Sequence, residues 1–268
     1  TTEFSRVLAD GVRSVTIAAY GAQAEHLAFV APQEVINFKP ASFPAMEADV
    51  DLEPLTMGAE INSFHALFAA SYARMIRITR AAIINNQVAD MSRLFTAMGG
   101  SAARLEARMV AAAMEANAEL DDGDVVFDAK YSNVLGTVES PGTLSGTNLG
   151  LAMALLRTQP TGSGQRADLR AKHLVVEPAL EFLARTLVRE SGLDVIVSVL
   201  ANLPTGRWYL LADQVACPTV GVLRLPGAKT PLRIEQKRPP VDFDGACTTV
   251  AADLGAFMLR RTGIVRAG

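Results

Sequence analysis

Few side chains in this chain have the types and spacing that chemistry requires. His26, His65 and His173 are the only candidates for an imidazole base, and none stands near a cysteine or carboxylate pattern that suggests a catalytic pair. His173 begins an apolar run and is most simply a histidine at the edge of the core. The segment Gly142 to Gly146, which contains Ser145, has the wrong spacing for a nucleophile elbow. We expect Ser145 to occupy a turn or to cap a helix.

Metal, thiol and cofactor chemistry find no better support. Asp121, Asp122 and Asp124 could hold a hard cation, but the other ligands of a loop site are absent, so a turn is the better interpretation. Cys217 and Cys247 lack metal-ligand spacing, and we expect two buried free thiols. The chain contains no H-E-x-x-H, no G-x-G-x-x-G after a strand and no Walker-type loop. We therefore predict no enzyme and no catalytic, cofactor-binding or metal site.

Composition argues against several other classes of protein. Half of the 268 residues are apolar and 20% are charged, which is typical of a folded chain with a full core. The net charge of −3 gives no global attraction to nucleic acid or to an anionic membrane. Arg74, Arg77 and Arg80 favour a solvated or interface face, because no aromatic residues are interleaved with them for base stacking. No apolar run approaches the ~20 residues of a membrane span, and no signal-peptide pattern is present.

The elements that must position these residues begin with an arm and a hairpin. Residues 1–39 mix short apolar runs with polar breaks and indicate no core of their own, as in an arm that packs on another surface. Residues 47–53 alternate acidic with small or apolar side chains, the period of a half-exposed strand. A turn at 54–58 and a return strand at 61–80 would complete a hairpin. Because a lone hairpin is marginal in water, it should lie on another surface.

A long helical pattern follows the hairpin. Asn85 or Asn86 is a suitable N-cap, and apolar residues then recur at helical spacing. The Gly99–Gly100 pair should bend or interrupt the helix, since each glycine costs roughly 1 kcal/mol relative to alanine in a helix interior. Ser101 would cap a second helix ending at Leu120. That helix would have one wet face, carrying Arg104, Glu106 and Arg108.

The remainder predicts a compact α/β unit and a set of closing strands. Helices are expected at 147–157 and from Pro178 to residue 190. Strands are expected at 125–127, 173–176, 194–199, 208–212, 219–225, 232–236, 247–252 and 256–260. The fold class is therefore α+β.

The order of these elements resembles the major capsid protein of tailed bacteriophages, the Hong Kong 97-type fold, and especially its Mu-like branch. The resemblance covers most of the chain from about residue 40. Each matching stretch is loose alone, and their joint order is the specific signal. The stretches are Tyr72-Ala73-Arg74, residues 78–85, 94–104, 117–127 and 174–181, Trp208-Tyr209-Leu210-Leu211-Ala212-Asp213, and Asp253-Leu254-Gly255.

The resemblance implies both an architecture and a function. The architecture is an N-terminal arm at 1–39, an E-loop hairpin at 40–80, a P-domain with a long spine helix at 81–137, an A-domain at 138–225 and a return to the P-domain at 226–268. The function is self-assembly into hexamers and pentamers that form an icosahedral shell around packaged double-stranded DNA. Implied partners are copies of itself, a portal, decoration or scaffolding proteins and weakly bound DNA, with no membrane. The expected location is the virion, after assembly in the bacterial host cytoplasm.

Three features qualify the resemblance. Asn85-Asn86-Gln87 stands where relatives often show Asn-Asp-Asp, so that acidic feature is missing. No lysine lies between Lys39 and Lys130, so we expect no isopeptide link from an E-loop lysine. Thr1 fits either initiator removal or cleavage by a maturation protease.

Three other functions stay open at this point. An encapsulin-like nanocompartment shell would share the fold but package enzymes. A soluble α/β enzyme with an unrecognised site would be a monomer or small oligomer. The third alternative is a structural adaptor that does not assemble.

Overall fold

A computed structural model describes residues 2–34, 56–61, 64–79, 88–120, 122–136, 142–161, 165–237 and 245–268. Within these ranges, only the backbone is described for residues 2–9, 56–61, 64–69 and 88–91 and for Ala246. The chain divides into two compact units. Unit 1 contains residues 1–24, 34–106 and 223–255, and unit 2 contains residues 25–33, 107–222 and 256–268.

Unit 1 is built on a four-stranded antiparallel sheet. The strand order is β2 (Thr56–Ile61), β3 (Phe64–Thr79), β10 (Gly245–Leu254) and β9 (Leu232–Lys237). Because side chains alternate across a strand, one face carries Ile76 and Ile78 of β3 beside Val250 of β10 and Ile234 of β9. Two helices, α1 (Thr2–Gln23) and α3 (Val88–Glu115), supply Val12, Phe95 and Met98 to the core on this face.

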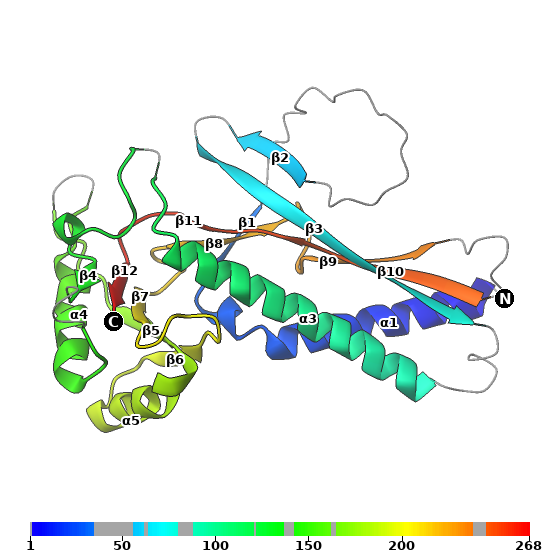
Figure 1. Cartoon of the computed structure of the whole chain (residues 1–268), viewed down its shortest axis with the longest axis horizontal. Helices are drawn as coiled ribbons and strands as arrows, with labels where there is room; N and C mark the ends of the chain where they lie inside the picture. The colour runs from blue at the N-terminus through cyan, green and yellow to red at the C-terminus, as the bar shows by residue number, and fades with distance from the viewer. Residues whose placement is uncertain are drawn as a thin grey trace. The chain divides into compact units, whose positions relative to one another are not determined.

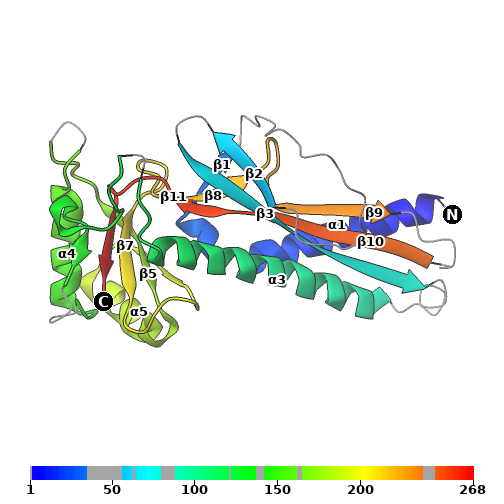
Figure 2. The ribbon, with the colours of Figure 1, turned by 45° about the horizontal axis from the view of Figure 1, so that its top comes forward.

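The helix α1 was not predicted, and its contact with α3 explains an error about the glycine pair. Figures 1 and 2 show α1 running beside the first part of α3. A Cβ on Gly99 would overlap the carbonyl oxygen of Thr16 and lie 3.0 Å from the backbone nitrogen of Tyr20. The α3 helix therefore continues through Gly99 and Gly100, where a bend and a new cap at Ser101 were expected. The glycines permit close helix packing.

The predicted hairpin is confirmed in part. The return strand corresponds to β3, but Thr56 to Gly58 are paired with β3 instead of forming the expected turn. The register shifts between Ala59 and Ile61. The predicted strand at 47–53 and the predicted caps Asn85 and Asn86 lie outside the described residues.

Unit 2 is built on a five-stranded mixed sheet. The strand order is β4 (Val134–Leu135), β12 (Ile264–Ala267), β7 (Trp208–Ala212), β5 (Ala171–Val176) and β6 (Ile196–Val199). The β4–β12 and β5–β6 pairs are parallel, and the other two are antiparallel. Helices α4 (Gly146–Thr158) and α5 (Glu181–Ser191) pack on one face of this sheet. Short 3₁₀ turns are η1 (Glu25–Ala28), η2 (Ala129–Tyr131) and η3 (Pro178–Leu180).

Alternation along the strands of this sheet separates two cores. Leu174, Trp208 and Leu210 face α4 and α5, whereas Val175 and Tyr209 face a second core formed with Val110, Met114 and Phe127. Trp208 is fully buried, and its indole Nε1 donates to the carbonyl oxygen of Gly142 at 2.8 Å. The three-stranded sheet β1 (Ala31–Glu34), β8 (Val220–Arg224) and β11 (Ala256–Met258) adds Val220 and Val222 to the second core.

Most predicted elements of this unit are confirmed, with two exceptions. The helices at 147–157 and after Pro178 and the strands at 173–176 and 208–212 are present within a few residues of the expected ends. Residues 125–127 do not form a strand, since Val125 makes only an isolated bridge with Glu119. The strand β12 was not predicted.

Candidate interaction surfaces

The residues with potential for catalysis do not gather into a catalytic arrangement. His26 is buried in η1, and His173 is buried in β5, where desolvation lowers the pKa of its imidazole. The side chain of His65 lies outside the described residues. Ser145 is the N-cap of α4 and accepts a hydrogen bond from the backbone nitrogen of Asn148 at 3.2 Å, as expected. Among the described residues, no three His, Cys, Asp or Glu side chains are close enough to hold a metal ion.

The cysteines and the acidic turn have structural roles. Cys217 and Cys247 are both free and buried, which confirms their prediction. Arg261 donates two hydrogen bonds to the carboxylate of Asp122, one of them 2.7 Å from Nη2 to Oδ1. Asp124 pairs with Lys130 at 2.8 Å and accepts a hydrogen bond from the Tyr131 hydroxyl.

These partners account for the electrostatics of the acidic turn. They lower the pKa of both carboxyl groups, mainly through the hydrogen bonds from Arg261 to Asp122 and from Lys130 to Asp124. The Arg261 guanidinium also lies 4.2 Å from the centre of the Tyr131 ring. Basic side chains already satisfy the carboxylates, so the turn interpretation of Asp122 and Asp124 holds. Asp121 lies outside the described residues.

A buried polar cluster joins α1, α3 and β8 inside unit 1. Arg224 Nη1 lies 2.5 Å from Glu106 Oε1, and Nη2 lies 3.2 Å from Oε2. The hydroxyl of Tyr20 donates to Glu106, and burial raises the pKa of this phenol. Glu106 was placed on a wet face by the sequence, and that was wrong because its side chain is 0% exposed. The signal was available in the helical spacing of Phe95, Gly99, Ala102 and Glu106, which places them on one face.

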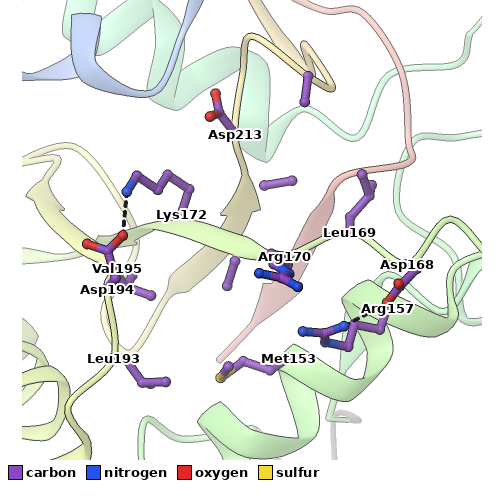
Figure 3. A pocket seen from close by; sticks show the side chains of 13 residues that line it. Met153, Arg157, Asp168, Leu169, Arg170, Lys172, Leu193, Asp194, Val195 and Asp213 are labelled. Atoms are coloured by element: carbon purple, nitrogen blue, oxygen red, sulfur yellow. Dashed lines mark hydrogen bonds and ion pairs between the residues drawn. The ribbon is translucent and has the colours of Figure 1, made fainter.

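Unit 2 has an open pocket whose charges largely neutralise one another. Figure 3 shows Arg170 lying between two ion pairs, Arg157–Asp168 at 2.7 Å and Lys172–Asp194 at 2.8 Å. The hydrogen bond between Lys172 and Asp194 raises the pKa of the lysine and lowers that of the carboxyl group. Since three cations face three carboxylates among the described lining residues, Asp213 included, the pocket favours neither an anion nor a cation.

A groove of about 430 Å³ lies in unit 1, where the described helices leave part of the sheet face uncovered. Its floor contains Tyr72 of β3, Ala252 of β10 and Leu232 of β9, three residues paired across the sheet. Leu94 and Leu105 of α3 form part of the opposite wall. Tyr72 is 42% exposed and Leu94 is 46% exposed. Exposed apolar side chains gathered in one hollow indicate an interaction surface.

The groove also carries an uncompensated charge. Among the described residues that line it, the charged ones are Arg74 and Arg104, both positive. Arg104 Nη1 donates to Gln23 Oε1 at 2.8 Å, which orients its guanidinium. The sequence singled out Arg74 as part of an interface face, but gave no indication that Arg104 lies on the same groove.

Comparisons with known proteins agree in kind. Residues 67–267 match a family model described as "Phage capsid protein", a span with parts in both units. No curated protein matches the chain. The fold is similar to that of the virus-like particle from Pyrococcus furiosus, at a TM-score of 0.52 and 11% identity over 97% of this chain and 98% of that one.

Two further solved structures are more distant in their geometry. The capsid of cyanophage P-SCSP1u gives a TM-score of 0.46 at 12% identity, covering 90% of this chain and 85% of that one. The SrpI encapsulin of Synechococcus elongatus PCC 7942 gives a TM-score of 0.48 at 10% identity, covering 90% and 84%. No helix among the described residues is long and apolar enough to cross a membrane.

Proposed function

The chain belongs to the phage capsid protein family, and from this membership we infer how it acts. It is a major capsid protein with a Hong Kong 97-type fold, and copies of it form an icosahedral shell. The observation that carries this conclusion is the family match over residues 67–267, which takes in the sheet of unit 1 and the sheet of unit 2. We propose that the copies first associate as hexamers and pentamers. Assignment to the Mu-like branch stays a prediction.

The proposed domain plan follows from the resemblance. Residues 1–39 would be the arm, 40–80 the E-loop, 81–137 the P-domain with its spine helix, 138–225 the A-domain and 226–268 the return to the P-domain. In this plan α1 belongs to the arm, β2 and β3 to the E-loop, and α3 is the spine helix. The plan is supported by the length of α3 and by the compact sheet and helices of unit 2.

The role we propose is mechanical. A closed shell requires the same surface to meet its neighbours repeatedly, through heterologous contacts that close at slightly different angles. Stable contacts of this kind bury on the order of 2,000 Å² or more per interface. No catalytic residue is assigned, and the exposed apolar groove of unit 1 supports an assembly role.

The proposed contents and partners follow from the same role. We infer that the shell encloses double-stranded DNA, held by weak and non-specific contacts so that the genome can later leave. A portal and decoration or scaffolding proteins would be its other partners. The protein would assemble in the bacterial host cytoplasm and remain in the virion.

Electron microscopy of the purified chain tests the assembly role. Closed icosahedral particles, or hexameric and pentameric rings, would support it. A uniform small species would contradict it, provided that circular dichroism shows a folded protein with the helix and strand content described above. Nucleic acid protected from nuclease inside native particles would support the DNA cargo, whereas particles filled with an enzyme would favour the encapsulin-like alternative.

A further inference from the structure

We propose that the groove of unit 1 binds an extended acidic segment, residues 47–53, of a second copy of the chain. The inference rests on the proposed assembly role and deepens it, because it names the two surfaces that meet. The contact would be made by apolar side chains on the groove floor and by carboxylates facing Arg74 and Arg104.

The shape of the groove favours a narrow, extended partner. Helices α1 and α3 cover the end of the sheet face that carries Ile76 and Ile78. At the other end, the described helices leave the row formed by Tyr72, Ala252 and Leu232 uncovered. An extended segment with side chains on alternating sides can place one set on this floor and direct the other set to the rim.

The charge of the groove favours an acidic partner. Within the part of the chain that the structure describes, Arg74 and Arg104 line it and no carboxylate does, although the whole chain carries a net charge of −3. Arginine forms planar, two-pronged contacts with carboxylates, and the Gln23 side chain already holds Arg104 in place. An acidic segment would therefore lose little side-chain freedom at Arg104 on binding.

The chain itself contains a segment with this chemistry. Residues 47–53 read Glu-Ala-Asp-Val-Asp-Leu-Glu, with four carboxylates in seven residues. Ala48, Val50 and Leu52 alternate with them, so an extended conformation presents an apolar edge and an acidic edge. The apolar edge suits Tyr72 and Leu232, and the acidic edge suits the two arginines.

Protein suits this groove better than nucleic acid does. Phosphates would pair with the arginines but would gain nothing from the exposed Tyr72 and Leu94. Tyrosine and arginine together are typical of the centres of protein interfaces. A second copy is the natural source, because each copy in a shell brings an equal number of grooves and acidic segments together.

Charge reversal separates this inference from the wider assembly role. Arg74→Glu should raise the protein concentration needed for shell formation by at least about tenfold, equivalent to about 1.4 kcal/mol. The matched control is Arg77→Glu, since Arg77 is an exposed arginine of the same strand on the opposite sheet face. Adding Asp49→Arg and Asp51→Arg to Arg74→Glu should recover most of the lost assembly.

The outcomes distinguish the groove contact from the assembly role. If the wild-type chain forms shells and Arg74→Glu assembles as well as Arg77→Glu does, this groove contact is wrong and the assembly role stands. The groove contact is also wrong if the acidic-to-basic changes give no rescue. If the folded wild-type chain forms no shells or rings at all, the assembly role itself fails.

A cross-linking measurement covers the case in which the charge variants fold poorly. Benzoylphenylalanine in place of Tyr72 keeps an aromatic ring on the groove floor. In shells grown from mixed isotope-labelled and unlabelled protein, irradiation should join it to a peptide containing residues 47–53, with mixed-label products. A cross-link to a different segment, products joined only within one copy, or no product in intact shells would overturn the proposal.

Discussion

The carboxylate of Glu106 and the guanidinium of Arg224 form an ion pair that solvent barely reaches, with side chains 0% and 4% exposed and 2.5 Å between Oε1 and Nη1. A buried pair adds little net stability when both charges are desolvated, but it is costly to break from one side only. Because Tyr20 donates to the same carboxylate, the pair also ties α1 to α3 and β8.

Glu106→Gln should therefore destabilise unit 1 strongly. The change leaves the Arg224 charge buried without a counter-charge, which costs about 3–5 kcal/mol. Urea denaturation of the unassembled subunit, followed by circular dichroism, would measure the loss. The control is Glu181→Gln, since Glu181 forms an exposed pair with Arg185 and should change stability by about 0.5 kcal/mol or less. Equal effects of the two changes would contradict the importance given to the buried pair.

Two glycines inside helices should respond in opposite directions to alanine. Gly99→Ala should destabilise the protein by about 1–3 kcal/mol, because its new Cβ would overlap the Thr16 carbonyl oxygen. Gly150→Ala on α4 should stabilise it by roughly 0.5–1 kcal/mol, since a Cβ there meets nothing within 4 Å and alanine favours the helix. Thermal unfolding of both variants is the test. A stabilising Gly99→Ala would show that α1 does not pack closely on α3.

The burial of His173 should make stability depend on pH. Desolvation lowers the pKa of its imidazole in the folded protein, so the unfolded chain binds the proton first as the pH falls. The contribution is complete above the ordinary histidine pKa of about 6.5 and is lost progressively below it, down to the lowered folded pKa. His173→Gln should show a smaller loss of stability between pH 7.5 and pH 5.5 than the wild type does. Parallel pH profiles for the two proteins would rule this out.

The assembled shell should separate completely on a boiled denaturing gel. No lysine lies between Lys39 and Lys130, so the hairpin region has no amine for an isopeptide bond. A single monomer band from purified particles is the expected result. A ladder of multimers that survives boiling and reductant would contradict it. The shell's contacts should then also weaken in high salt, if paired charges such as those proposed at Arg74 contribute to them.

Sequence alone was a good guide where the signal is local. Ser145 is followed by apolar residues at helical spacing, and it caps α4 as expected. The runs at 173–176 and 208–212 are short, apolar and bounded by polar residues, which suffices to predict buried strands of a central sheet. Pro178 opens a helical segment because its fixed backbone angle suits a first turn.

It was a poor guide where a distant partner decides the structure. Gly99 has two opposite meanings, a helix break or a close crossing, and only the position of Thr16 on α1 selects the second. Glu106 looks like a surface residue until Arg224 of β8 is placed beside it. The groove depends on the register that pairs Ala252 with both Tyr72 and Leu232, which no local pattern encodes.

Trp208 gives the protein a built-in optical probe. It is the only tryptophan of the chain, and it is fully buried in unit 2 with its indole nitrogen bonded to the Gly142 carbonyl oxygen. Intrinsic fluorescence excited at the indole band therefore reports the environment of unit 2, while circular dichroism sums over both units. If the two signals change at different urea concentrations, the units unfold separately, and a shell subunit could loosen one half while the other keeps its native emission.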